Sequence, residues 1–210
     1  HNRLSSAHQP GLWAYDADNR LTQYGQGDAL TALSHTANGH LDIEQRITGQ
    51  TRFTYDAGER LRRIDIDGQE RARYQYDPFG RRIAKIVGSQ TTWYLHAPEG
   101  LIAELDTTGH LIRTYGWQPN AAYGTAPLWQ AEIAGTAWRS YVFQTDPLGT
   151  VQLATDAQGQ IAWTARSEAF GLTTPDPSST ITVNLRFPGQ YYDEESGLHY
   201  NYYRDYDPTT

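Results

Sequence analysis

Apolar and polar side chains alternate along most of this chain, which is the pattern of half-buried β-strands. Pairs that share one face of such a strand recur at Phe53 and Tyr55, Ile64 and Ile66, Tyr74 and Tyr76, Trp93 and Leu95, Tyr141 and Phe143, and Val151 and Leu153. The best helical candidate is the short segment GDALTALSH, residues 27–35. The pattern therefore predicts an all-β fold with a short helix at most.

A short motif interrupts the alternation at intervals. YDADNRL begins at Tyr15, YDAGERL at Tyr55 and YDPFGRRI at Tyr76, and shorter Asp-x-x-Gly forms occur later in the chain. We expect each Asp to accept hydrogen bonds from N–H groups inside a hairpin turn, and Gly or Asn to take the positive-φ position. The predicted turn residues are Asp16, Asp56, Asp77, Gly80, Asp106, Gly109, Asp146, Gly149, Asp156, Gly159, Asp193 and Gly197.

The spacing of the motifs suggests how the hairpins assemble. Asp56 and Asp77 are 21 residues apart, whereas Asp16 and Asp56, like Asp106 and Asp146, are 40 apart. Because two ordinary strands with their turns take about 20 residues, these distances correspond to one and two hairpins. A single hairpin cannot bury its own apolar face. The repeat therefore predicts an elongated, curling antiparallel sheet in which neighbouring hairpins pack together.

Breaks in the pattern divide the chain into three segments. Residues 1–172 form the predicted hairpin sheet, with a loop expected at residues 118–130. TTPDPSST, residues 173–180, is rich in Pro and Ser and is expected to connect the sheet to the last segment. Residues 181–210 form a terminal cassette that is unusually rich in Tyr. Tyr has an apolar body and a polar tip, so it suits half-buried strand faces.

Composition narrows the function classes. A net charge of −7 argues against non-specific nucleic-acid binding. The lack of Cys removes disulfides and thiolate metal sites, and the seven His show no ligand spacing, so we expect no metal and no cofactor. No apolar run reaches the length of a membrane span. The lack of Met suggests a piece of a longer polypeptide.

Three features together resemble the Rhs/YD-repeat family. They are the YDxxxR repeats, the segment YVFQTDPLGTVQLATDAQGQIAW and the cassette LRFPGQYYDEESGLHYNYYRDYDP, of which the last two resemble the repeat-associated core region. The resemblance covers the chain from Tyr15 onward. It implies a spiralling β-shell, or cocoon, of the kind that encloses a toxic C-terminal domain in type VI secretion effectors and in the C component of Tc toxins.

The resemblance also implies partners and a location. The partners are the remaining shell of the same polypeptide, the C-terminal toxin domain, and secretion-spike or chaperone proteins. Such proteins are assembled in the bacterial cytoplasm and then secreted or delivered by a secretion system. In the bacterial members the chain cuts itself near a DPxGL motif, where aspartates act as an aspartyl-protease-like pair. This sequence stops at DYDPTT, before that motif.

Paired carboxylates are the first candidates for chemistry. By resemblance, Arg204 and Asp205 match positions linked to self-cleavage in a longer parent. The alternative is another YD turn, in which Arg204 pairs with an acid and Asp207 anchors the turn before a Pro. Glu194 and Glu195 resemble glycosidase acids only superficially, and a solvated hairpin turn is the preferred interpretation.

Other residues have structural interpretations. DIDGQE at Asp65 resembles the start of a calcium loop, but a hairpin tip is preferred because the full ligand pattern is missing. The cassette tyrosines suit either a stacking platform or packing between strands, and packing is favoured, with Leu198, Tyr200 and Tyr202 on one face of a two-faced strand.

Three functions remain open at this point. The first is a non-enzymatic shell segment of a polymorphic toxin, the second a self-cleaving aspartyl-type domain, and the third a teneurin-like or wall-associated module that binds glycans or cell surfaces.

Overall fold

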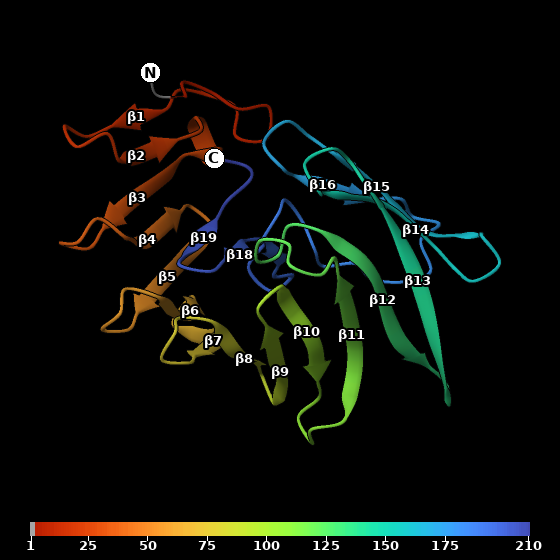
Figure 1. Ribbon diagram of the computed structural model, residues 1–210. Helices are drawn as coiled ribbons and strands as arrows, with labels where there is room; N and C mark the ends of the chain where they lie inside the picture. The colour runs from red at the N-terminus through yellow and green to blue at the C-terminus, as the bar shows by residue number, and fades with distance from the viewer. Residues whose placement is uncertain (1–2) are drawn as a thin grey trace. The chain divides into compact units, whose positions relative to one another are not determined.

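A computed structural model describes residues 3–210, and β-strands account for nearly all of the regular structure in that range (Figure 1). Gly27–Ala29 form one turn of 3-10 helix, η1. Strands β1 to β16 pair antiparallel with their neighbours in chain order, while β17, β18 and β19 form a separate three-stranded sheet. The predicted all-β fold and the pairing of hairpin-linked strands are therefore confirmed.

The chain divides into two compact units, His1–Tyr74 with Thr209–Thr210 and Gln75–Pro208. The strands of the first unit are β1 (Ala14–Tyr15), β2 (Leu21–Tyr24), β3 (Thr31–His35), β4 (Leu41–Arg46), β5 (Gly49–Tyr55) and β6 (Leu61–Ile66), and β7 (Gln69–Tyr76) contains the boundary. The second unit continues with β8 (Arg82–Val87), β9 (Gln90–Ala97), β10 (Gly100–Leu105), β11 (Leu111–Trp117), β12 (Pro127–Ala134), β13 (Ala137–Thr145), β14 (Val151–Thr155), β15 (Ile161–Ser167) and β16 (Thr173–Pro175). The terminal cassette adds β17 (Tyr191–Tyr192), β18 (His199–Asn201) and β19 (Arg204–Tyr206).

The turns explain the YDxxxR motif. Asp56 Oδ1 accepts hydrogen bonds from the backbone N–H of Gly58 at 2.8 Å and of Arg60 at 3.1 Å. The Arg60 side chain then donates from Nε to Asp56 Oδ2 at 2.9 Å. The same arrangement joins Asp16 to Arg20 and Asp77 to Arg81. One carboxylate thus satisfies the turn backbone and an ion pair at the same time.

The third residue after the motif Asp has left-handed backbone geometry. Its φ is 86° at Gly80, 86° at Gly109, 96° at Gly149 and 77° at Gly159, and Asn19 and Glu59 take φ of 61° and 64° in the same place. Glycine pays no steric cost there, whereas other residues do. Gly197, four residues after Asp193, has φ of 75°.

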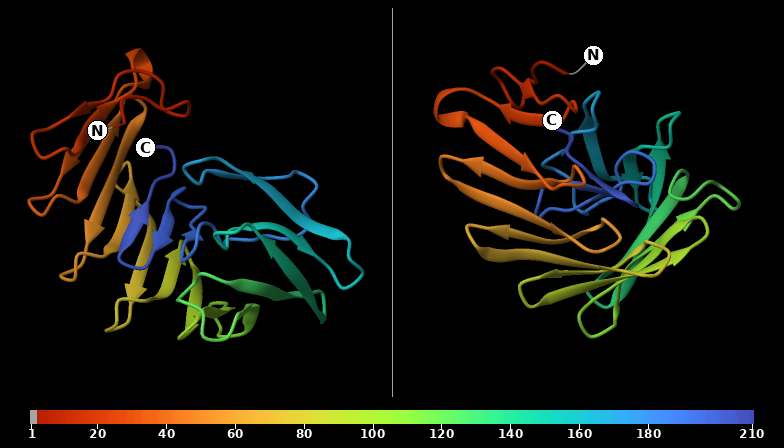
Figure 2. Two further views of the ribbon diagram at one scale, coloured as in Figure 1. Left: turned by 45° about the horizontal axis from the view of Figure 1, so that its top comes forward. Right: turned by 90° about the vertical axis from the view of Figure 1, so that its left-hand side faces the viewer.

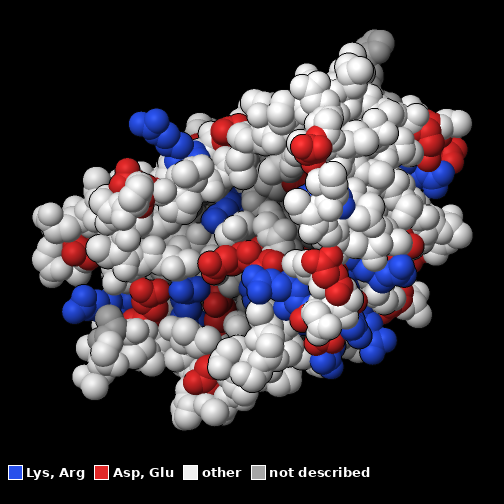
Figure 3. Space-filling model, turned by 180° about the vertical axis from the view of Figure 1, so that it is seen from behind, with Lys and Arg blue, Asp and Glu red and all other residues white. Residues whose placement is uncertain are grey.

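The first unit carries a small apolar core and a charged surface. Trp13 packs against Tyr24 with ring centroids 6.2 Å apart, and Phe53 and Ile64 are buried in the same unit. Asp65 is ion-paired with a neighbouring arginine on β6, and the β6–β7 turn lies just after it, as a hairpin tip requires. Acidic and basic side chains lie next to one another on the face that Figure 3 shows.

The core of the second unit lies between its large sheet and the terminal cassette. The cassette packs against one face of the sheet (Figure 2). The sheet contributes Tyr94, Tyr115, Tyr141, Phe143 and Trp163 to this core, and the cassette contributes Val183, Leu185, Tyr191 and Tyr200. On β13 the period of two is clear, because Tyr141 and Phe143 are buried while Val142 between them is 53% exposed.

Two local predictions were wrong. The helical candidate at residues 27–35 contains only the short η1, and Thr31–His35 is strand β3. The backbone of these residues pairs with β4 in register Thr31 to Arg46, and that ladder outweighs a weak helical tendency. In addition, the expected loop at residues 118–130 ends earlier, because β12 begins at Pro127.

The cassette also differs from the expected two-faced strand. β18 ends at Asn201, and Tyr202 lies in the turn after it with φ of 57°. His199 and Tyr200 are both buried, at 1% and 6% exposure, although they are neighbours in the strand. The strand is therefore covered on both faces, which alternation alone cannot reveal.

Candidate functional site

The contact between the sheet and the cassette is organised by a buried arginine. Arg82 begins β8 and is 2% exposed. Its backbone N–H donates to the Tyr200 hydroxyl at 2.9 Å. Its guanidinium forms a two-bonded ion pair with Asp193, with Nη2 lying 2.9 Å from Oδ1. Two parallel hydrogen bonds of this kind fix orientation as well as charge.

A second cation completes the cluster. Lys85 Nζ lies 3.1 Å from Asp193 Oδ1 and 3.0 Å from Glu195 Oε2. Both glutamates lie in the predicted turn, and Glu194 is exposed as expected, but Glu195 is buried, so the predicted solvation was wrong for Glu195. The two cations and two carboxylates balance in charge, which is what burial of such groups requires. We call Arg82, Lys85, Asp193 and Glu195 the buried ion cluster.

Three tyrosine rings surround the Arg82 guanidinium. Its central carbon lies 4.3 Å from the ring centroid of Tyr200, 5.2 Å from that of Tyr94 and 5.5 Å from that of Tyr191. Each ring face attracts a cation, and the attraction is stronger out of water. Since Tyr191 and Tyr200 are buried, these cassette rings pack inside the protein and offer no stacking surface to an external sugar or base.

Asp193 shows how a turn residue can have a second role. Its carbonyl accepts from the N–H of Ser196 at 3.2 Å and of Gly197 at 2.8 Å, so the chain does turn here. Its side chain, however, binds Arg82 and Lys85 instead of the turn backbone. The sequence motif predicts the turn and gives no sign of the distant partners.

Asp205 lies beside the buried ion cluster. It stands directly opposite Tyr200 in the β18–β19 register, and residues opposite each other share a face. Burial raises the pKa of Asp205 to about 7, with Arg82 lowering it and Asp193 raising it. Arg204 is exposed, so the structure does not place it on the same face as Asp205. Asp207 lies just after the end of β19.

A second buried polar network links the sheet to the cassette. Glu104 is 4% exposed and accepts hydrogen bonds from Tyr115 at 2.5 Å, Tyr191 at 3.1 Å and Arg113 at 3.2 Å. Arg113 also lies 3.3 Å from Glu132 on the neighbouring strand. Sequence reasoning missed this network. Alternation places Glu104 on the face of β10 opposite Ala103, whereas the structure buries both residues, so the pattern carried no signal for it.

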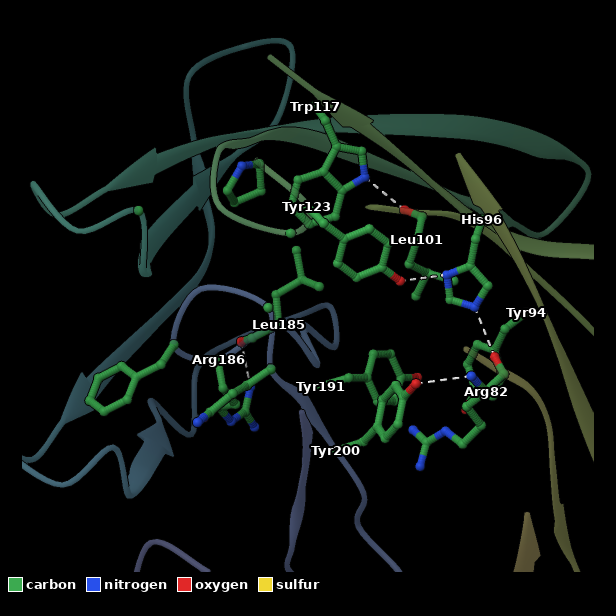
Figure 4. A pocket seen from close by; sticks show the side chains of 16 residues that line it. Arg82, Tyr94, His96, Leu101, Trp117, Tyr123, Leu185, Arg186, Tyr191 and Tyr200 are labelled. Carbon is green, nitrogen blue, oxygen red and sulfur yellow. Dashed lines mark hydrogen bonds between the residues drawn. The ribbon is translucent and has the colours of Figure 1, made fainter. Parts of the chain in front are cut away.

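A cavity of about 40 Å³ lies beside Arg82 and the tyrosine rings around it (Figure 4). On its wall, His96 contacts the Arg82 carbonyl through Nε2 at 2.8 Å and the Tyr123 hydroxyl through Nδ1 at 2.7 Å. A carbonyl can only accept, so Nε2 carries the proton and Tyr123 donates to Nδ1. Burial lowers the pKa of His96, which favours this neutral tautomer.

Residues 3–210 contain neither a cluster suited to a metal ion nor a membrane-spanning helix. No group of three or more His, Cys, Asp or Glu side chains in that range is arranged to hold a metal ion. The same residues include no helix with the length and apolarity that crossing a membrane would need.

Comparison with known proteins agrees with this architecture. The family described as the teneurin YD-shell matches residues 1–210. The double-stranded DNA deaminase toxin A of Burkholderia cenocepacia is 32% identical over 229 residues, covering 92% of this chain and 16% of the relative. The probable deoxyribonuclease RhsA of Dickeya dadantii is 31% identical over 160 residues, covering 74% of this chain and 11% of the relative.

A solved structure has the same fold. The Tc holotoxin pore of Photorhabdus luminescens matches with a TM-score of 0.62 and 17% sequence identity, over 97% of this chain and 12% of the matched chain. This chain thus spans less than a fifth of the length of each of these three proteins.

Proposed function

This chain belongs to the Rhs/YD-repeat family, and from that we propose that it is a segment of a β-shell that encloses and helps deliver a C-terminal toxin domain. In this proposal residues 1–172 are shell, residues 173–180 connect, and residues 181–210 are the closing cassette. The observation that carries the proposal is the buried ion cluster, which fixes the cassette to the sheet through Arg82 and Asp193. The balance of charge matters because an unpaired charge buried between cassette and sheet would destabilise the docked cassette.

The partners follow from the same proposal. They are the rest of the shell in the same polypeptide and the toxin domain itself, with secretion-spike or chaperone proteins as further candidates. The protein is then assembled in the bacterial cytoplasm and delivered by a secretion system. The segment acts without catalysing a reaction of its own.

We further propose that this segment takes part in self-cleavage of a longer polypeptide. An aspartyl mechanism needs one ionised and one protonated carboxyl. Asp205, whose pKa is raised to about 7 by burial, is suited to be one of them in a longer polypeptide that supplies the second. There, Asp205→Asn should block release of the C-terminal domain, and Arg204→Ala should slow it. Intact mass of the full-length protein and both variants measures this, and complete cleavage in Asp205→Asn would remove Asp205 from the mechanism.

Enclosure itself is tested by protease protection. In the full-length protein, the C-terminal domain should resist a broad-specificity protease while the shell is closed. Asp193→Asn removes the carboxylate that forms the two-bonded ion pair with Arg82 and should make the domain accessible. Glu194→Gln, at the exposed neighbouring position, is the matched control and should preserve protection. Equal digestion rates in the wild type and Asp193→Asn would contradict the proposal.

A further inference from the structure

One face of strands β11, β12 and β13 points away from the cassette and carries a groove of about 550 Å³. The charged residues of these strands, Arg113, Glu132 and Arg139, stand in register with one another on the opposite face, which carries the cassette. A sheet face that meets water is ordinarily polar, so the groove has the composition of a covered surface. All seven side chains that line it are uncharged: Leu111, Thr114, Trp129, Ala131, Trp138, Ser140 and Val142.

The groove has a regular relief. Thr114, Ala131 and Ser140 stand opposite one another across the three strands and form a row of small side chains, which we call the recess. Two residues along the strands, Ile133 and Trp138 form a row of large side chains, which we call the ridge, and each is 47% exposed. A low row and a high row therefore lie side by side, roughly 7 Å apart.

Trp129, on the other side of the recess, does not form a second ridge. A Cβ added to Gly116 would lie 2.0 Å from Trp129 Nε1, so the indole ring lies against Gly116 on the neighbouring strand. The recess is therefore bounded by a tall row on one side and by a ring that lies low on the sheet on the other. A surface that fits this relief presents one row of large side chains to the recess.

The exposed apolar area of this face is large enough for a stable interface. Trp93, Trp129 and Trp138 are 39%, 38% and 47% exposed, and Trp93 shares the face because Tyr94 beside it belongs to the core. With up to about 250 Å² for a whole Trp side chain, these three rings expose roughly 300 Å². Specific interfaces bury roughly 600–1,000 Å² on each partner. The face approaches that range once the exposed aliphatic side chains are included, which are Leu95, Leu111, Ile133 and Val142.

The relief favours a second copy of the same face as the occupant. An added strand is excluded, because β11, β12 and β13 already pair along both edges. A two-fold axis that runs parallel to the rows and midway between them places the ridge of each copy over the recess of the other. Large side chains then face small ones, which is how two stacked sheets interdigitate about 10 Å apart.

We propose that this chain forms a closed two-fold dimer through this face, in which Ile133 and Trp138 of one protomer lie over Ala131 and Ser140 of its partner, and the reverse. Each protomer uses the same patch, so association stops at two chains. The dimer lies on the face opposite the cassette and is independent of the role proposed for the buried ion cluster.

Light scattering of the 210-residue chain across a concentration series measures the stoichiometry. The mass should rise from one chain to a plateau at two. A mass that stays at one chain overturns the proposal and leaves the face to a different protein. A mass that grows beyond two chains indicates open-ended association at sheet edges and overturns it as well.

A matched pair of variants tests how the rows pair. Ser140→Trp fills the recess and Trp138→Ala lowers the ridge, and both positions are exposed, so the fold should persist. Each variant alone should raise the dissociation constant of the dimer roughly tenfold or more, as loss of a central Trp contact does. In an equimolar mixture the added indole of one copy meets the shortened side chain of the other, and the affinity should return close to that of the wild type.

Retention of untagged Trp138→Ala by tagged Ser140→Trp measures the mixed dimer, and thermal unfolding of each variant checks its fold. Gln158→Trp, at an exposed position of the β14–β15 turn, is the matched control and should dimerise like the wild type. A mixture that associates no better than the separate variants overturns the proposed pairing. If Ser140→Trp fails to fold, the comparison of Trp138→Ala with the wild type still decides, because equal dissociation constants for these two proteins overturn the proposal.

Discussion

At the scale of single residues, each Asp-Gly turn is held by contacts among neighbouring positions of the chain, as at Asp146. The Asp side chain, the N–H groups it satisfies and the positive φ of the Gly after it all lie within five residues, so local chemistry determines them. The residues that hold the cassette are different. Asp193 and Arg82 are 111 residues apart, and nothing in either local sequence identifies the other.

The glycines of two turns should differ in their tolerance of a side chain. At Gly159 an added Cβ meets no atom within 4 Å, so Gly159→Ala costs only the positive φ, about 1 kcal/mol. At Gly149 the added Cβ would lie 2.1 Å from the Thr125 carbonyl oxygen, which belongs to the backbone. Gly149→Ala should therefore cost several times more. Urea unfolding of both variants measures this, and equal losses would contradict the turn packing.

The pH dependence of stability should change in Asp205→Asn. The pKa of Asp205 is about 7 in the folded protein and 3.8 as an ordinary carboxyl, so the folded state binds the extra proton between these values. Stability due to this group is therefore lost as pH rises through that window. His199, whose pKa is lowered to about 4 by burial, acts in the opposite direction below pH 6.5.

Asp205→Asn removes the contribution of Asp205 to the pH dependence and leaves that of His199. From pH 5 to pH 8, the free energy of unfolding of Asp205→Asn should gain about 2 kcal/mol relative to the wild type. Denaturant unfolding at both pH values is the measurement. A constant difference between the two proteins would show that Asp205 titrates normally.

At the scale of elements, strand existence and pairing followed from alternation and turn spacing, and the errors have physical causes. Thr31–His35 is strand β3 and not helix because its backbone pairs with that of β4. The cassette strand β18 stops after three residues because the chain turns at Tyr202, and both of its faces are covered, by Arg82 on one side and by Gln190 on the other. These outcomes depend on tertiary contacts, which a period of two along the chain does not contain.

Docking of the cassette should depend on charge balance in the buried ion cluster. Asp193→Asn leaves Arg82 buried without its carboxylate, and loss of one partner of a buried pair costs about 3–5 kcal/mol. Glu194→Gln removes an exposed charge one residue away and should stay within about 0.5 kcal/mol. Thermal or urea unfolding compares them. A small effect of Asp193→Asn would mean that solvent reaches the cluster.

At the scale of the whole molecule, the repeat predicts strand order along the entire chain, because each hairpin pairs with the next. It does not predict where the chain separates into two units. That boundary lies inside β7, in a stretch whose alternation is unbroken. The strands beyond Gln75 share a hydrophobic core with the cassette. The sequence pattern of those strands does not show which of them the cassette covers.

Apolar side chains on β12 and β13 form an exposed cross-strand ladder on the sheet of the second unit. In the β12–β13 register, Trp129 stands opposite Val142 and Ile133 opposite Trp138, and these side chains are 38%, 53%, 47% and 47% exposed. Tyr141, one residue from Val142, faces the cassette, so the ladder lies on the other face of the sheet. Contiguous exposed apolar surface of this kind favours contact with another protein surface.

We expect the 210-residue chain to associate as its concentration rises, because contact between chains removes these rings from water. Trp138→Lys with Val142→Thr should reduce association without loss of stability, since both positions face away from the core. Leu148→Thr, at an exposed turn, is the matched control and should associate like the wild type. Sedimentation velocity across a concentration series measures the effect. A wild-type chain that stays monomeric at high concentration, or a double variant that associates equally, would show that this ladder does not drive association.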